Sequence, residues 1–223
     1  MLREVTSNDG FILCALTSLT LLLIVKLMHS RRLIDFLGFL GNSNYLRIYL
    51  KDHSFFDRFD VLLFINFCLN SVTFGFIVQR AQTRNIEMSS TAVFICIGLL
   101  ALVICLKIGF ELLIGYAFDL YKEMNILTFQ QISSLNFIGI LLLPINLILV
   151  FQFNFEKSAV ILCAISMLVV LGFGMAKTVQ SNLSLVLSNF LYFILYICTL
   201  EIGSLVVLYD LINESNYFRA PIL

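Results

Sequence analysis

The chain has 223 residues, of which 60% are hydrophobic and 13% are charged, and its mean hydropathy is +0.99. Soluble domains carry about 25% charged residues, so this composition excludes an ordinary soluble protein and indicates a surface that contacts lipid. The formal net charge is zero, which leaves no bulk electrostatic basis for binding nucleic acid.

Six apolar stretches are long enough, or nearly so, to cross a bilayer as helices, which takes about 20 residues each. Because these stretches are continuously apolar and do not alternate with polar residues, they predict helices rather than the strands of a barrel. We therefore expect an all-α fold, a single integral membrane domain over 1–223 with transmembrane helices at about 11–28, 61–78, 92–118, 132–153, 158–175 and 190–211.

The first stretch is followed by a basic flank that includes Arg31 and Arg32, which is typical of a retained transmembrane helix rather than a cleaved signal. The segment between the first two stretches, about 29–60, mixes basic residues with Leu, Ile, Phe and Tyr. This composition favours amphipathic segments in the membrane interface. A loop packed against the bundle is the alternative.

Three ionisable residues lie inside the predicted spans. Lys107 and Glu111 are four residues apart in the third span, and hence on one helix face, where their charges can neutralise each other. Glu201 lies near the middle of the sixth span. A charge at the bilayer centre costs at least ~2.5 kcal/mol, so we expect each of these residues to have a partner. If the third and sixth helices are neighbours, Lys107 and Glu201 lie at similar depth and can pair.

Three roles remain open for these charges. They form a salt-bridge network that fixes helix packing, or they relay a proton or ion or hold a charged partner helix, or they line a site for a lipid headgroup or substrate.

The fourth span carries Pro144, which predicts a kink because it removes one backbone hydrogen bond and frees a carbonyl about one turn earlier. Asn146 can satisfy such a group or bond to another helix. Only residues 154–157 separate the fourth and fifth spans, so these helices are expected to form an antiparallel hairpin.

Orientation follows from the Lys and Arg residues of the loops. The loops after the first, third and fifth spans carry eight: Lys26, Arg31, Arg32, Arg47, Lys51, Arg58, Lys122 and Lys177. The opposite side carries five: Arg3, Arg80, Arg84, Lys157 and Arg219. The first large loop is therefore expected to be cytoplasmic and both termini periplasmic.

No catalytic motif is recognisable, and we expect no catalytic residues, no metal site and no cofactor. The sequence has no GxSxG, HExxH, Walker loop or GxGxxG. Its two histidines, His29 and His53, both fall in the first loop, so they cannot form a metal cluster within the bundle. The six cysteines fall inside apolar runs, where they act as small hydrophobes.

The segment from Phe190 to Gly203, with Cys198-Thr199-Leu200-Glu201-Ile202 at its core, resembles the closing helix of a family of Bacteroidota inner-membrane proteins that contains a domain of unknown function. The Leu-Leu-Leu-Pro-Ile run at 141–145 and the basic flank at Arg31 also fit that family. Gly203-Ser204 departs from it, because a bulkier residue and Pro are expected there. The resemblance implies a polytopic inner-membrane protein, gives no activity and draws attention to Glu201.

Two functions are consistent with these observations. The first is a non-enzymatic inner-membrane subunit or assembly factor of an envelope complex, whose partners are membrane lipids and other membrane subunits. The second is a small transporter or proton-conducting protein in which Glu201 titrates. A lipid-modifying enzyme that uses His29 and His53 is a weaker third.

Overall fold

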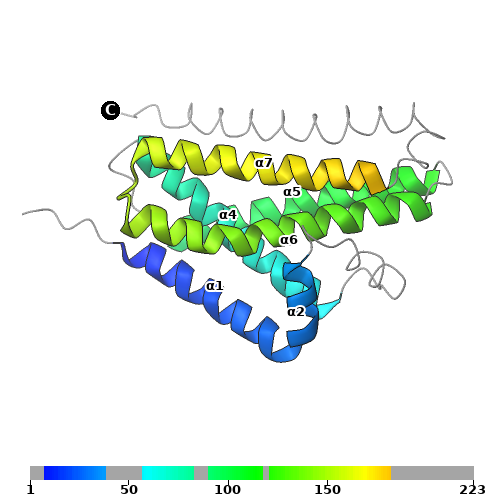
Figure 1. The fold of residues 1–223 in the computed structure, drawn as a ribbon, viewed down its shortest axis with the longest axis horizontal. Coiled ribbons are helices and arrows are strands. Elements are labelled where there is room, and N and C mark those ends of the chain that lie inside the picture. The colour runs from blue at the N-terminus through cyan, green and yellow to red at the C-terminus, as the bar shows by residue number, and fades with distance from the viewer. Residues whose placement is uncertain (1–7, 39–56, 83–89, 118–120, 182–223) are drawn as a thin grey trace, which may run out of the picture.

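The computed structural model describes residues 8–38, 57–82, 90–117 and 121–181, and all regular secondary structure in these ranges is helical (Figure 1). The helices are α1 (Asp9–Met28), α2 (Ser30–Leu37), α4 (Arg58–Gln82), α5 (Ser90–Ala117), α6 (Tyr121–Phe151) and α7 (Lys157–Ser181). The all-α prediction is confirmed for these residues.

Four helices are long and apolar enough to cross a membrane, and they coincide with the first four predicted spans. Their apolar segments are Asp9–Met28, Arg58–Gln82, Thr91–Ala117 and Met124–Phe151. The helix α7 covers the fifth predicted span and includes the apolar stretch Lys157–Val170. The sixth predicted span, 190–211, lies outside the described residues, within which four helices are candidate spans.

One predicted connection, the one before α6, differs from the structure. The helix α6 begins at Tyr121, well before the predicted start near 132, and its first turns already bury Met124, Leu127 and Phe129 within the bundle. The first large loop contains the eight-residue helix α2, within the region expected to hold amphipathic segments. Helices α6 and α7 pack side by side across the short connection 152–156, as the hairpin prediction requires (Figure 1).

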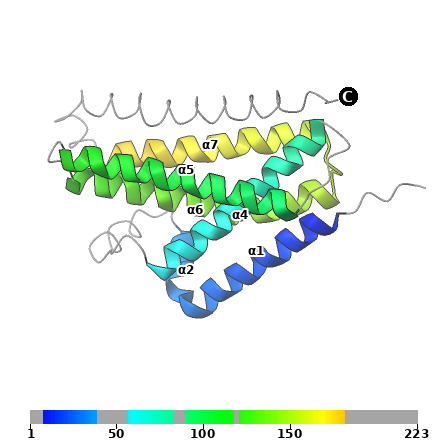
Figure 2. The same cartoon turned by 180° about the vertical axis from the view of Figure 1, so that it is seen from behind.

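The helix α4 lies at the centre of the bundle and contacts α1, α5, α6 and α7. Seen from both sides, it runs obliquely from the end of the bundle where α2 lies to the end where α6 turns into α7 (Figures 1 and 2). Arg32 of α2 contacts its first turn, and Phe155 of the hairpin contacts its last turn. The two ends of α4 therefore mark the two ends of the bundle.

The helices α4 and α6 approach each other closely at Gly139. A Cβ added to Gly139 would lie 2.6 Å from the Cα of Phe67, so only glycine permits this separation. Lipid tails are as apolar as Leu, and helices in a membrane are held by such close packing and by hydrogen bonds rather than by the hydrophobic effect. Gly139 is therefore part of what fixes α6 on α4.

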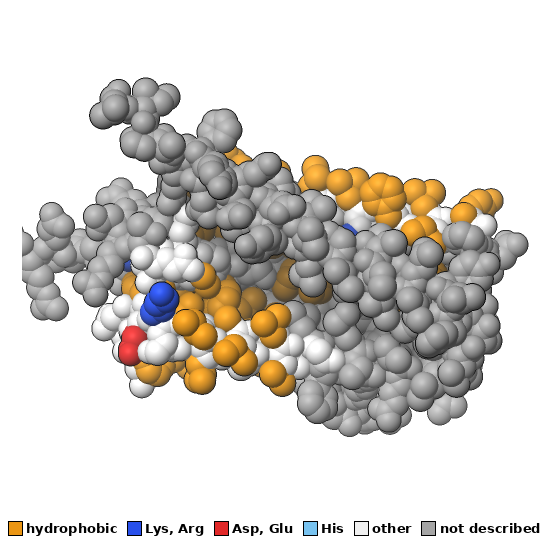
Figure 3. All heavy atoms as spheres, turned by 90° about the horizontal axis from the view of Figure 1, so that it is seen from above, with side chains coloured by type: hydrophobic (Ala, Val, Ile, Leu, Met, Phe, Trp, Pro, Cys, Tyr) orange, Lys and Arg blue, Asp and Glu red, His pale blue; other side chains and the backbone are white. Residues whose placement is uncertain are grey.

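The outer surface of the described residues is largely apolar. The most apolar window of α5 is only 6% buried, and Phe94, Leu113 and Tyr116 are among its exposed side chains. Seen from above, most of the coloured side chains are hydrophobic, and the most prominent charged ones lie toward one end of the bundle (Figure 3). This surface suits lipid contact and supports a multi-pass membrane protein.

Candidate functional site

Buried polar residues form a stripe along α4, and all of them except the first, Asp60, share one face of the helix. Its members are spaced so that each lies about one or two helical turns from the next, and in chain order they are Asp60, Asn66, Asn70, Thr73 and Arg80. Each residue of the stripe is at most 9% exposed. Buried polar groups in lipid need partners, so the partners of this stripe define the polar interior of the protein.

The middle of the stripe forms a hydrogen-bond network that joins three helices. Ser18 of α1 donates to Asn66 Oδ1 over 2.6 Å, and Asn70 Nδ2 donates to Ser18 Oγ over 2.8 Å. From α6, Asn146 Nδ2 donates to the backbone carbonyl of Asn70 over 3.0 Å. Asn66 Nδ2 also donates to the backbone carbonyl of Gly139 over 3.4 Å, at the tight contact between α4 and α6. The network ties α1, α4 and α6 together.

A small cavity of about 10 Å³ adjoins this network, with Asn70, Thr73 and Asn146 among its lining residues. Its size is close to that of one water molecule. Within the described part of the chain, Asn146 Oδ1 is buried and has no hydrogen-bond partner. The cavity thus offers room for one water that would complete the bonding of Asn146.

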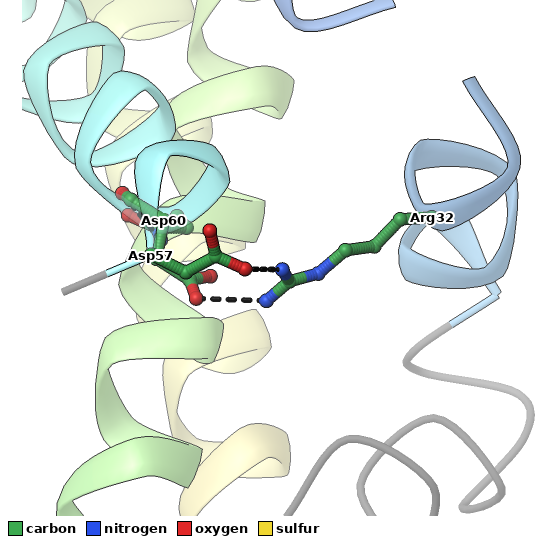
Figure 4. Close-up of polar contacts among 4 residues, drawn as sticks. Arg32, Asp57 and Asp60 are labelled. Atoms are coloured by element: carbon green, nitrogen blue, oxygen red, sulfur yellow. Dashed lines mark hydrogen bonds and ion pairs between the residues drawn. The ribbon is translucent and has the colours of Figure 1, made fainter. Parts of the chain in front are cut away.

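The first turn of α4 forms an ion cluster with α2 (Figure 4). The Arg32 guanidinium reaches both carboxylates: Nη1 donates to Asp57, and Nη2 donates to Asp60 Oδ2 over 2.9 Å. The guanidinium also lies 4.4 Å from the centroid of the Phe59 ring, a cation–π contact. Since Arg32 and Asp60 are both buried, this cluster anchors α2 on the start of the central helix.

Asp57 is the more exposed carboxylate of this cluster, and its side chain is 39% exposed. Burial acts to raise the pKa of Asp57, but the hydrogen bond and positive charge of Arg32 outweigh it, with smaller contributions from Arg58 and His29. The pKa of the Asp57 carboxyl therefore lies below its ordinary value of 3.8. Asp57 stays ionised at neutral pH, as its role in the pair requires.

The structure brings together two of the three intramembrane charges that the sequence singled out. Lys107 Nζ lies 3.8 Å from Glu111 Oε1 along α5, and Thr128 of α6 donates to Glu111 Oε2 over 3.0 Å. Glu111 is completely buried, whereas the Lys107 side chain is 23% exposed. The pair therefore belongs to the contact between α5 and α6. Glu201, the third charge, lies outside the described residues.

Pro144 lies within α6, which continues past it to Phe151. Its side chain is exposed, while that of Asn146 is buried and bonded to α4. The bond across to another helix that the sequence allowed for Asn146 is thus present.

Of the two histidines in the first loop, the structure describes only His29. His29 lies between α1 and α2, with its ring edge-on to Phe59 at 5.9 Å between centroids. His53 lies outside the described residues. Among the described residues, no group of three or more His, Cys, Asp or Glu side chains is placed to hold a metal ion.

Sequence reasoning missed most of the polar stripe. The sequence prediction placed Arg32, Asp60 and Arg80 in loops and did not single out Asn66 and Asn70 within the second span. A signal was present, because Asn66, Asn70 and Thr73 recur at spacings of four and three residues in a helix that is otherwise apolar. Such spacing predicts a polar face that must be turned toward other helices.

Comparison with protein families gives one match: residues 11–212 match the model described as Domain of unknown function (DUF4271). No curated protein and no solved structure matches the chain.

Proposed function

Since this chain belongs to the DUF4271 family, whose domain has no known function, we propose that it is a non-enzymatic subunit or assembly factor of a complex in the bacterial inner membrane. The main support for this proposal is that the buried polar side chains form hydrogen bonds and ion pairs between helices. Ser18, Asn66 and Asn70 bond to one another across helices, as do Arg32 and Asp60. This use of polar groups stiffens a scaffold, whereas a catalytic site would gather them around a cleft that admits a substrate.

The apolar outer surface supports the same proposal. A helix as exposed as α5 borders either lipid or the helices of another membrane protein. The inner-membrane location is part of the proposal, as is the Bacteroidota source, and both rest on the resemblance carried by residues 190–203. The periplasmic position of both termini rests on the loop charges.

Affinity purification of the tagged full chain from membranes in a mild detergent tests this proposal. We expect one or more membrane proteins to co-purify in constant ratio, identified by mass spectrometry. A variant with Glu111→Gln is the matched comparison, because it alters the buried pair of α5 without changing the outer surface. A monodisperse monomer without any co-purifying protein would overturn the proposal.

A small transporter or proton-conducting protein is the second candidate, and the complete burial of Glu111 favours it. A buried carboxylate that accepts from a hydroxyl is the type of group that takes up and releases protons inside a membrane. Glu201 is the other carboxylate in this proposal. Proteoliposomes loaded with a pH-sensitive dye test it: proton flux should be lost in Glu111→Gln or Glu201→Gln. If liposomes that contain the unaltered chain show no more proton flux than empty liposomes, the transporter proposal is ruled out.

A further inference from the structure

The last turn of α4 holds a second buried arginine, Arg80, whose surroundings differ from those of Arg32. Arg80 is 9% exposed, and its Nη1 donates to Asn8 Oδ1 over 3.1 Å. An arginine side chain has five N–H donors. Within the described ranges, this is the guanidinium's single hydrogen bond, and no carboxylate lies within ion-pair distance of it.

Two aromatic rings hold the Arg80 guanidinium. Its central carbon lies 4.2 Å from the centroid of the Phe155 ring and 5.5 Å from that of Phe11, and the two rings contact each other at 5.3 Å. Cation–π contacts of this kind orient the plane of the guanidinium but do not occupy its N–H groups. The rings therefore fix Arg80 in place with donors still to be satisfied.

The backbone that supplies Phe155 is strained. Phe155 has φ 62° and the preceding Asn154 has φ 45°, both in the left-handed region. A bulky residue is rare there, and strain of this kind costs about 1–3 kcal/mol and concentrates at functional sites. The strained turn between α6 and α7 puts the Phe155 ring against Arg80.

The charge of Arg80 needs compensation. Arg32, which is buried to the same extent at the other end of α4, is neutralised by Asp57 and Asp60. The acidic residues beside Asn8 and Phe155 do not serve Arg80 in this way: Asp9 is exposed, and Glu156 accepts from Ser158. A buried cation without an anion is strongly unfavourable, so an anion from outside the described chain is expected at Arg80.

The depth of Arg80 indicates which anion this is. Asp60 and Arg80 are 20 residues apart on one helix, which is about 30 Å along its axis and equals the thickness of the hydrocarbon core. With the Asp60 cluster at one boundary, Arg80 lies at the other, where lipid phosphates are concentrated. Lys157, exposed at the start of α7, adds a second cation to the same hairpin.

We propose that Arg80, held by Phe11 and Phe155, binds the phosphate of a lipid headgroup between the start of α1 and the α6–α7 hairpin. A guanidinium presents paired N–H groups that match two phosphate oxygens, and such charge-assisted pairs are among the strongest hydrogen bonds. The bound phosphate would neutralise Arg80, and its acyl chains would lie along the apolar surface.

Thermal unfolding and native mass spectrometry of the full chain in a neutral detergent test this site. The probes are dioctanoyl phosphatidylglycerol, dioctanoylglycerol with the same chains but no phosphate, and inorganic phosphate. We expect only the first to raise the melting temperature in a saturable manner. Arg80→Gln should weaken its binding at least about tenfold. Arg58→Gln, which removes an exposed arginine at the other end of α4, should bind as the unaltered chain does.

Arg80→Lys keeps the charge without the fork of N–H groups, so it provides a folded variant in case Arg80→Gln does not fold. We expect an intermediate affinity for phosphatidylglycerol. Unchanged affinity in Arg80→Lys or in Arg80→Gln would overturn the proposal. An equal temperature shift with inorganic phosphate would assign the site to a free anion, and an equal shift with dioctanoylglycerol would assign the effect to the acyl chains; either result rejects a lipid phosphate site.

Discussion

Ser18 of α1 donates a hydrogen bond to Asn66 of α4 over 2.6 Å, and both residues are completely buried. Forty-eight residues of sequence separate the two, and the first loop lies between them. The nearest other polar partner of both groups is Asn70, whose Nδ2 donates to Ser18 Oγ over 2.8 Å and to Asn66 Oδ1 over 3.2 Å. The pair therefore fixes the register of α1 on α4, and Asn70 and Asn146 extend the same restraint to α6.

Removing the centre of this network should destabilise the bundle. We expect Asn66→Ala to lower the free energy of unfolding by about 1–2 kcal/mol, because interhelical hydrogen bonds in membranes reach ~1.7 kcal/mol and Asn66 takes part in several. Thr20→Ala is the control, since that exposed hydroxyl donates only to its own helix at Thr17. Unfolding followed by circular dichroism in detergent measures both. Equal stability of the two variants would show that the network does not hold the helices.

The close contact of α4 and α6 should tolerate no side chain at Gly139. A Cβ there meets the backbone of Phe67, which cannot move aside as a flexible side chain can, so the two helices must separate. We expect Gly139→Ala to cost about 1–3 kcal/mol, the range for overpacked cores. Gly75→Ala is the matched variant, because a Cβ on that α4 glycine meets nothing within 4 Å.

Gly75→Ala should be neutral or stabilising by up to about 1 kcal/mol, since alanine favours helix more than glycine does. The melting temperatures of the two variants should therefore move in opposite directions or differ clearly in size. If both alanines are tolerated alike, α4 and α6 are farther apart than the structure places them.

The positions of the membrane helices were predictable from sequence, whereas their polar contacts were not. Span length and hydropathy decide where a helix lies, and α1, α4 and α5 begin and end within a few residues of the predicted ranges. Which face of each helix is buried depends on its neighbours, and spans that are apolar all round carry little information about that face. The sequence predicts that the fourth span begins near 132, so Thr128, the partner of Glu111, falls outside every predicted span.

The charged residues of the first loop also have contacts that the sequence does not predict. Arg32 counted toward the orientation of the chain as a loop charge, yet it is buried and paired with Asp57 and Asp60. Its partners lie 25 and 28 residues away in sequence, and no local pattern connects them to Arg32. Glu201 belongs to the segment that carries the family resemblance, but it lies outside the described residues. Its pairing with Lys107 therefore stays a prediction.

The pair of Arg32 and Asp57 should make stability depend on pH. The pKa of Asp57 is lowered in the folded chain, so unfolding raises its proton affinity. Its contribution to stability is then present above the ordinary value of 3.8 and is lost as the pH falls through the lower, folded pKa. We expect thermal stability to decline as the pH is lowered from about 5 to about 3.

Asp57→Asn should reduce this decline, because the variant has no carboxyl to protonate at that position, and it should lower stability at neutral pH, where the ion pair is lost. Asp35→Asn, on the exposed side of α2, is the comparison that removes a carboxylate elsewhere. The interpretation fails if Asp57→Asn and the unaltered chain lose stability in parallel over this range.

The contact between α5 and α6 depends on Glu111 and Thr128. Thr128→Val keeps the shape of the side chain and removes the hydroxyl that donates to Glu111 Oε2. Since Glu111 is completely buried, we expect a loss of about 1–2 kcal/mol. Combining Thr128→Val with Glu111→Gln in a double-mutant cycle should give a coupling energy of about 0.5 kcal/mol or more. Strictly additive effects would show that the two groups do not interact.

Substitutions of Phe155 test whether the contacts of its ring offset the cost of its left-handed backbone conformation. Phe155→Leu keeps the side chain in the left-handed region, where φ is 62°, but removes the ring that lies 4.2 Å from the Arg80 guanidinium. We expect this variant to lose about 1–2 kcal/mol, the range of a well-desolvated cation–π contact together with lost packing. Phe155→Gly also loses the ring, but glycine adopts positive φ without strain, so it should recover part of that loss. Melting temperatures should fall in the order Phe, Gly, Leu; if the leucine variant is as stable as the unaltered chain, the ring does not hold Arg80 in place.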